Sequence, residues 1–253
     1  VIAIPIEQMS PQIPWLPLDP KNIPTAEYYV FNTQKPPFNN LFVRQAFAST
    51  VDRLAVVDVA ESTNFTGKRK AATTLTPPQV LGANLYNVVG RNLNAPLAQD
   101  LLEQAGYPQG KDFPKVTLVV NLPGGDRKSA QAQVAETIVA DWRRWLNVTV
   151  EIKYIEDWEE YLDYIATNTP QLYRMGWQAD VNDPDNFLSL FTTGAERNRG
   201  RFSDVDFDHL VAEGAALASN PAARQLVYIE AEHILCETKV GIIPFFHSFI
   251  TQK

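Results

Sequence analysis

The sequence predicts an α/β fold, in which helices pack against a β-sheet, and three observations lead to this prediction. Segments with the apolar spacing of amphipathic helices alternate along the chain with short apolar or alternating segments typical of strands. Apolar residues make up 45% and charged residues 20% of the 253 residues, which are ordinary values for a globular protein with a core. The sequence contains neither an internal repeat nor an apolar run of the ~18 residues that a membrane helix needs.

The first 93 residues are expected to contain an arm, a strand, a helix and a loop. The arm is expected to be extended because proline fixes φ and removes a backbone donor, and it carries Pro5, Pro11, Pro14, Pro17, Pro20 and Pro24. Aromatic and β-branched residues predict a strand over 27–32. Asn40 is a suitable N-cap for a helix over 41–60, whose apolar residues recur every three or four positions. Residues 61–93 lack any period and are predicted to form a long surface loop.

Helices and strands alternate through the rest of the chain. Asn94 as N-cap and Gly106 as stop signal delimit a predicted helix over 95–105. The helices predicted after it cover 127–146, 157–166, 206–218 and 222–236. The strands predicted in the same region cover 116–121, 148–154, 171–177 and 240–246. This alternation predicts a sheet with helices packed on it.

Composition excludes several classes of function. The net charge of −7 should repel phosphate backbones, so we expect no nucleic-acid partner. Cys236 is the only cysteine, so no intrachain disulfide and no cysteine-based zinc site can form, and it is predicted to be a small buried apolar residue. The first residues have neither the basic start nor the apolar run of a signal peptide, which leaves the compartment open because a mature or shortened chain would look the same.

No catalytic set of residues is visible in the sequence. Nucleophilic catalysis needs a serine or cysteine beside a histidine and a carboxylate, but there is no Gly-x-Ser-x-Gly motif, and nothing nearby orients the pair His247-Ser248. His209 and His233 are expected near the surface rather than as metal ligands, because no His-x-x-x-His spacing occurs. We therefore predict that the protein is not an enzyme and holds no metal or cofactor.

The densest group of candidate site residues lies where the strand predicted at 171–177 opens into a polar turn. Arg174, Trp177 and Asp180 offer a cation, an aromatic face and an anion within seven residues, which suits a zwitterionic ligand. Ligands bind at the ends of strands in open α/β sheets. The alternative is that Asp180, Asn182 and Asp183 only cap the next helix and Trp177 belongs to the core. The residues alone favour this alternative.

The same stretch resembles a known family signature. Residues 176–188, GWQADVNDPDNFL, resemble the pattern GWxADxxDPxNFL of the family 5 extracellular solute-binding proteins, the oligopeptide- and dipeptide-binding components of bacterial ABC importers. Residues 28–47 resemble the block that contains "PPFxdxrvRqA", and residues 98–110 resemble "AkxLLxeAGYpxG". Residues 224–232 resemble the closing block "Rxxlyxxae". All of these blocks appear in the order of the family.

The resemblance implies a periplasmic-binding-protein type II-like lobe, with a mixed sheet flanked by helices, from a two-lobe venus-flytrap protein. Family members are about twice as long, so the chain is expected to be the C-terminal half. We expect residues 1–31 to be a proline-rich arm and hinge strand of the missing first lobe, 32–238 to be the second lobe, and 239–253 to return to the first lobe. Apolar surface exposed in this way should cause dimerisation or repacking through the arm and residues 240–250.

The resemblance also implies a function and roles for particular residues. Such a protein captures extracellular peptides between its lobes and delivers them to a membrane permease, in the periplasm or at the extracellular face of the cell membrane. By the resemblance, Asp180 holds the α-ammonium of the peptide, Trp177 lines a side-chain pocket and Arg174 meets the peptide carboxylate. Water screens an ammonium paired with Asp180 when half of the cleft is absent, so this chain alone should bind weakly.

Three further residues are implied to line the cleft, on the strand that crosses between the lobes. These are Tyr28, Tyr29 and Asn32, and which tyrosine faces the ligand stays open because adjacent strand residues point to opposite sides. Other cargoes of this family remain alternatives, namely an oligosaccharide, a nickel complex or an opine. A sugar would stack on Trp177 and the tyrosines, whereas the pair of Arg174 and Asp180 favours a peptide. A sensor that reports peptides to a receptor is a further alternative.

Overall fold

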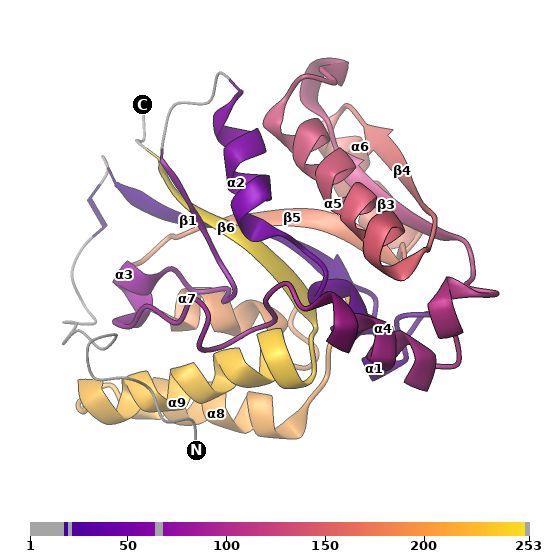
Figure 1. Ribbon diagram of the computed structural model, residues 1–253. Coiled ribbons are helices and arrows are strands. Elements are labelled where there is room, and N and C mark those ends of the chain that lie inside the picture. Colours follow the sequence, from indigo (N-terminus) through magenta and orange to yellow (C-terminus); the bar gives the residue numbers. More distant parts are fainter. Residues whose placement is uncertain (1–17, 20–21, 64–67, 251–253) are drawn as a thin grey trace.

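Six strands form one mixed β-sheet at the centre of the chain (Figure 1). The computed structural model describes residues 18–19, 22–63 and 68–250. Across the sheet the order is β2-β6-β1-β5-β3-β4, in which β1 is antiparallel to both neighbours and β3 is parallel to both of its own. The strands are β1 Ile23–Phe31, β2 Arg69–Ala71, β3 Val116–Asn121, β4 Val150–Ile155, β5 Leu172–Gln178 and β6 Ile242–Ile250.

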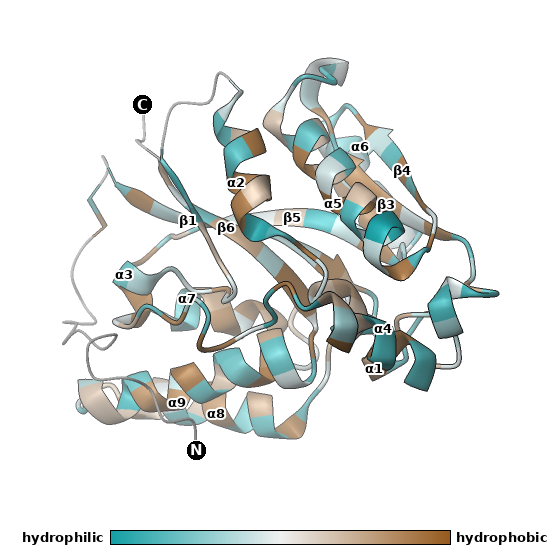
Figure 2. Cartoon of the chain, viewed as in Figure 1, coloured by the Kyte–Doolittle hydropathy of each residue, from teal (hydrophilic) through white to brown (hydrophobic). Residues whose placement is uncertain are grey.

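Helices cover both faces of this sheet, as the alternation in the sequence predicts. Their bounds are α1 Leu41–Ala48, α2 Arg53–Glu61, α3 Pro78–Leu81, α4 Ala95–Gln104, α5 Ala130–Leu146, α6 Trp158–Thr167, α7 Asp185–Leu188, α8 Val205–Ala216 and α9 Pro221–His233. In α2, α5 and α9, hydrophobic and hydrophilic residues occur on the same helix, as expected for helices with one buried side (Figure 2). The α/β architecture is therefore confirmed.

Side-chain caps determine where most of these helices begin. The residue before each of α1, α2, α4, α5, α6, α8 and α9 accepts a first-turn backbone N–H with its side-chain oxygen. A cap of this kind typically stabilises a helix by about 1 kcal/mol. The predicted caps Asn40 and Asn94 are confirmed, since they accept from the backbone N–H groups of Phe42 and Leu97.

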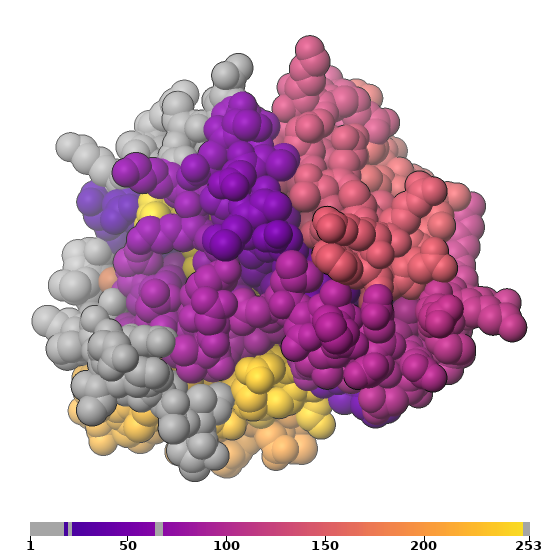
Figure 3. All heavy atoms as spheres, in the orientation of Figure 1, coloured from indigo at the N-terminus to yellow at the C-terminus, as the bar shows by residue number. Residues whose placement is uncertain are grey.

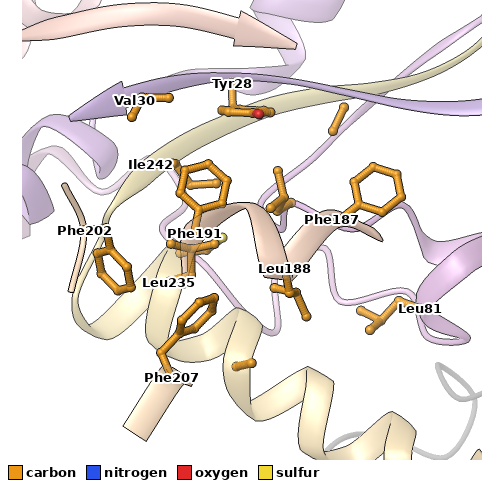
Figure 4. Close-up of a cluster of buried hydrophobic side chains, with 14 of the residues drawn as sticks. Tyr28, Val30, Leu81, Phe187, Leu188, Phe191, Phe202, Phe207, Leu235 and Ile242 are labelled. Carbon is orange, nitrogen blue, oxygen red and sulfur yellow. The ribbon is translucent and has the colours of Figure 1, made fainter. Parts of the chain in front are cut away.

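Two apolar clusters sandwich the sheet, one on each face. The cluster below β1 in Figure 4 joins the sheet to α6, α7, α8 and α9, and Tyr28 and Val30 belong to it. The cluster on the opposite face joins the sheet to α1, α2, α4 and α5, and it contains Tyr29 and Phe31. On this second face α2 and α5 pack together, and their atoms form part of the surface shown in Figure 3. Consecutive residues of β1 therefore pack into two different cores, one on each face of the sheet.

The helix predicted over 41–60 is wrong, because the chain forms two helices, α1 and α2. Asp52 begins α2 by accepting the backbone N–H of Ala55, and its own N–H donates to the carboxylate of Asp141. The carbonyl of Phe47 accepts from the indole N–H of Trp142 at 3.0 Å, so it is satisfied outside the helix. Both partners lie in α5, about 90 residues away, which is why the apolar period alone predicts a continuous helix.

Two buried arginines attach α1 and α2 to the β6 region. Arg44 donates through Nε to the carbonyl of Val240 at 2.9 Å, and Arg53 donates through Nε to that of Pro244 at 2.7 Å. Burial lowers the pKa of each guanidinium to about 10, so both remain charged at neutral pH. Backbone carbonyl dipoles stabilise both charges. Arg53 therefore has a structural role, and the neighbouring carboxylate of Asp52 caps α2.

The prediction of a surface loop over 61–93 is also wrong. The segment contains β2 and α3, and residues 73–76 are buried. The carboxylate of Glu232 accepts the backbone N–H groups of Leu75 and Thr76 at 2.8 and 2.7 Å. The imidazole of His247 is within hydrogen-bonding distance of the carbonyls of Thr74 and Leu75. These two distant side chains satisfy a backbone that would otherwise need water.

The strands predicted near the two ends of the chain are present, but their bounds differ from the predicted ones. Strand β1 begins at Ile23, four residues before the predicted strand, and β6 continues to Ile250. The prolines predicted to form an arm lie outside the described residues, apart from Pro24, which is part of β1. The predicted domain boundaries and the predicted dimerisation stay predictions. No helix in the described ranges is long and apolar enough to cross a membrane.

Candidate functional site

A cavity of about 310 Å³ lies over the carboxyl-terminal half of β5, on the face of the sheet that carries Tyr29. Strands β1, β5 and β6 supply most of its floor, and the amino-terminal turn of α5 supplies one wall. The lining residues include Thr25, Glu27, Tyr29, Arg69, Arg174, Gln178 and Ser248. Two further hollows, of about 680 and 660 Å³, lie beside the edge strands β4 and β2 and contain none of the predicted site residues.

An ion pair between Glu27 and Arg174 occupies the centre of the cavity floor. The guanidinium donates from Nε to Oε2 at 2.9 Å and from Nη2 to Oε1 at 2.6 Å, so the contact is bidentate. The two side chains are only 16% and 13% exposed. Burial lowers the pKa of Arg174, but the carboxylate of Glu27 more than offsets this effect, and the net direction is upward. Arg174 is therefore charged and already paired.

Gly176 makes room for this pair. It lies directly opposite Glu27 in the antiparallel register of β1 and β5. A Cβ atom at this position would lie 2.8 Å from Oε1 of Glu27, too close for an ordinary contact. Because Gly176 has no side chain, the carboxylate can lie over β5 and reach the guanidinium two residues away.

Aromatic side chains form much of the remaining cavity wall. A bulge in β6 places Phe245 and Phe246 side by side at the cavity, and the ring of Phe245 lies 5.0 Å from that of Tyr29. At the opening, Trp158 is 44% exposed and stacks on Tyr161, whose hydroxyl donates to the carbonyl of Arg174. The cavity thus combines aromatic walls with one neutralised ion pair and a second arginine, Arg69.

The structure separates the two tyrosines that the sequence could not distinguish. Tyr29 lines the cavity, whereas Tyr28 lies on the opposite face, where its ring packs edge-on against Phe191 at 5.7 Å. Burial raises the pKa of both hydroxyls, so both are neutral. Asn32 is buried, donates to the carbonyl of Thr169 and accepts from the N–H of Gln34. Asn32 therefore stabilises the turn after β1 and does not line the cavity.

Arg174 and Trp177 point to opposite faces of β5, because they are an odd number of residues apart. The ring of Trp177 packs against the cluster that contains Tyr28, and its Nε1 donates to Oδ1 of Asn186 at 3.1 Å. The same oxygen accepts the backbone N–H of Asp180 at 2.9 Å. Asn186 thus holds the turn after β5, and the carboxylate of Asp180 is exposed at this turn.

The other aspartates of the turn are structural. Asp183 forms a bidentate ion pair with Arg224 of α9, with N–O distances of 2.7 and 2.8 Å. The side chains of Asp183 and Arg224 are 6% and 4% exposed. Asp185 accepts from the hydroxyl of Tyr228, which also accepts from Arg224. Asp183 and Asp185 thus use their carboxylates within the protein, and for Asp183 this agrees with the alternative of a structural role.

The site offers no arrangement suited to a metal. In the ranges 22–63 and 68–250, no group of three histidine, cysteine, aspartate or glutamate side chains could hold a metal ion. Cys236 is buried, as predicted, and its thiol donates to the buried carboxylate of Glu232. Burial raises the pKa of this thiol well above its usual value, so it stays protonated.

Sequence reasoning missed Glu27 and Asn186. Glu27 is the single charged residue in a strand whose other residues, apart from Thr25, are apolar or aromatic, and this contrast was a signal that could have identified it. Asn186 lies within the motif, and the pattern alone gives it no separate role. Its role becomes visible only when β5 and α7 are placed together.

Comparison with known proteins agrees with this architecture. Residues 4–199 match the family described as bacterial extracellular solute-binding proteins, family 5 Middle. The probable deoxycholate-binding periplasmic protein YgiS of Escherichia coli is 30% identical over 96% of this chain and 44% of its own length. The periplasmic murein peptide-binding protein MppA of the same organism is 31% identical over 87% of this chain and 39% of its own length.

Solved structures show the same fold. The unliganded open form of MppA superimposes with a TM-score of 0.73 at 26% identity, over 91% of this chain and 44% of that one. HbpA2 from Haemophilus parasuis superimposes with a TM-score of 0.74 at 27% identity over the same shares. The chain spans less than half the length of these relatives. The matched family is one of binding proteins and not of enzymes, and the chain belongs to it: it is a bacterial extracellular solute-binding protein of family 5.

Proposed function

We propose that this chain is the second lobe of a two-lobe receptor that captures peptides and delivers them to an ABC permease. In this proposal the ligand lies across the carboxyl end of β5, with its α-ammonium on Asp180 and its neighbouring groups over the cavity. The observation that carries the proposal is the exposed carboxylate of Asp180, on a turn whose backbone Asn186 fixes beside the cavity floor. An exposed carboxylate on a fixed backbone at a strand end suits an ammonium group.

The relatives support a peptide as the ligand without limiting the choice to it. MppA is named for murein peptides, and OppA of Escherichia coli, 29% identical over 87% of this chain, is named for oligopeptides. YgiS is named for deoxycholate and a protein of Haemophilus influenzae for heme. By the same proposal the whole protein works in the periplasm or at the outer face of the membrane.

An apolar solute is the second candidate, because four aromatic side chains line the cavity on the face of Arg174. They are Tyr29, Trp158, Phe245 and Phe246. Such a ligand would be held by burial of apolar surface and would need no partner for an ammonium group. The two candidates therefore differ in whether Asp180 contributes to affinity.

The test is a calorimetric titration of the two-lobe protein with a pool of di- to pentapeptides. We expect N-acetylation of the peptides and the substitution Asp180→Asn each to weaken binding by about tenfold, or about 1.4 kcal/mol. Asp100→Asn, the same change at an exposed position of α4, is the matched control and should leave affinity unchanged. Heat with deoxycholate but none with any peptide would reject the peptide proposal in favour of the second candidate.

A further inference from the structure

Glu27 is the only carboxylate among the residues described as lining the cavity. Its carboxylate accepts three hydrogen bonds, of 2.9, 2.6 and 2.5 Å, from the guanidinium of Arg174, and both side chains are largely removed from water. An ion pair with this geometry and burial is stronger than a surface pair, since little solvent screens it. A ligand carboxylate could take over the bidentate pairing through Nε and Nη2 of Arg174 only by displacing Glu27.

The second cation of the cavity wall, Arg69, is held by its surroundings. Its Nη1 donates to the carbonyl of Ala60 at 2.8 Å, and its guanidinium lies 5.2 Å from the centre of the Phe246 ring. Burial lowers the pKa of Arg69, and the carboxylate of Glu27 opposes this change, which shows that Glu27 acts electrostatically on both arginines. Removal of Glu27 would therefore leave two cations and no anion along the wall.

The pair leaves one type of contact available to a ligand. Nη1 of Arg174 donates to no residue within the described part of the chain, so it can meet a carbonyl or amide oxygen. An uncharged group gains this contact at no electrostatic cost. A carboxylate would instead lose its hydration and approach the carboxylate of Glu27 in a partly buried cavity.

We propose that Glu27 is a specificity-determining residue, which neutralises Arg174 and makes the cavity select uncharged ligand groups over carboxylates. This inference rests on the proposed function, in that it names the chemical class of side chain that the cavity admits. It also reverses the role that the family resemblance gave Arg174: the guanidinium holds Glu27 in place and does not bind the carboxylate of the peptide.

The experiment compares tripeptides that carry glutamine or glutamate at each position in turn, because the two side chains have nearly the same shape. At the position whose side chain enters the cavity, the wild-type two-lobe protein should bind the glutamine form at least about tenfold more tightly. Glu27→Gln should reduce this preference by about tenfold or reverse it. Glu103→Gln, the same change at an exposed position of α4, is the matched control and should leave the preference intact.

Two further variants separate the charge effect from a fault in folding. Glu27→Gln/Arg174→Met removes both charges, and the preference should return toward the wild-type value. Arg174→Met alone leaves Glu27 without its counterion, so the preference for glutamine should widen. This second arm keeps the inference testable if Glu27→Gln does not fold. Equal preference in wild type, Glu27→Gln and Arg174→Met, with glutamine peptides still bound, would overturn it.

A separate arm distinguishes failure of this inference from failure of the peptide proposal. Thermal unfolding of the 253-residue chain is measured with phenylacetamide or phenylacetate, since a ligand that binds the folded state raises the midpoint. Phenylacetate should raise the midpoint of Glu27→Gln more than that of wild type. If no peptide binds but this difference appears, the peptide proposal fails and the role of Glu27 stands. An equal rise of the midpoint in the two proteins when phenylacetate is added would reject that role.

Discussion

The ion pair between Asp183 and Arg224 offers the sharpest test of how the motif after β5 works. Asp183→Asn keeps the size of the side chain and the oxygen that accepts the backbone N–H of Asp185 at 2.8 Å. The substitution removes the charge opposite Arg224 and replaces one acceptor with an amide that cannot accept. Arg224 is 4% exposed, so water cannot replace the lost counterion.

The expected cost follows from leaving a buried cation without its partner. Breaking a buried ion pair on one side typically costs about 3–5 kcal/mol. For a chain of this length, each kcal/mol shifts the unfolding midpoint by about 2–4 °C, so we expect a fall of about 6–20 °C. Asp180→Asn, three residues earlier but exposed, should change the free energy of unfolding by less than about 0.5 kcal/mol.

The assay is urea unfolding of the 253-residue chain in a double-mutant cycle. Arg224→Met alone leaves the carboxylate of Asp183 buried and should be as costly as Asp183→Asn. The double variant Asp183→Asn/Arg224→Met contains no buried charge at this position, so its cost should be well below the sum of the two single costs. Strictly additive costs, or an unchanged midpoint for Asp183→Asn, would refute the structural role assigned to this aspartate.

Three further predictions concern other buried groups. Burial lowers the pKa of His247 to about 4 from 6.5, so the unfolded chain takes up a proton first as the pH falls. The contribution of the neutral imidazole to the free energy of unfolding is complete above pH 6.5 and is lost as the pH falls toward 4, by about 3 kcal/mol in all. His247→Gln should reduce the difference between the unfolding free energies that urea titrations give at pH 6.5 and at pH 4. Gly176→Ala should displace the carboxylate of Glu27 in a crystal structure and lower the unfolding midpoint; an undisturbed ion pair would contradict the steric argument. Asp52→Ala should cost about 0.5–2 kcal/mol of unfolding free energy, because α2 loses its N-cap, whereas Asp58→Ala within the same helix should cost less.

Local signals predicted the elements, and long-range contacts determined where those predictions failed. The starts of the helices at Leu41 and Ala95 depend on a cap one residue earlier, so the sequence alone identifies them. The break between α1 and α2 depends on Trp142 and Asp141 in α5, which no window around residue 50 contains. The apolar period continues across the break because both helices face the same core.

The buried segment 73–76 shows the same limit more strongly. It has few apolar residues and no period, so it is typical of a surface loop. Its backbone is nevertheless satisfied by Glu232 and His247, more than 150 residues away in the chain. Only the pairing of β2 with β6 and the packing of α9 bring these groups to the segment. A loop of this kind cannot be recognised before the topology is known.

The alternation of side chains along a strand predicts part of the arrangement of the candidate site. Arg174 and Trp177 lie three residues apart on a strand, so the sequence already implied that they point to opposite faces. The pairing of Arg174 with Glu27 was not implied, because it requires β1 and β5 to be neighbours in a register that places Gly176 opposite Glu27. The family pattern identified the turn correctly, but it did not reveal that the arginine is already paired.

Some residues of the motif after β5 form the turn, whereas others could be substituted without disturbing it. Asp183, Asp185 and Asn186 use their polar atoms within the protein, so substitutions there should first affect stability. Asp180 is exposed, and Glu27 lies outside the motif on a neighbouring strand. By the proposals made for Asp180 and Glu27, binding preference changes at these two positions while the turn stays intact. In those proposals the scaffold keeps the strand end in place, and Glu27 on β1 neutralises Arg174 in the cavity beside it.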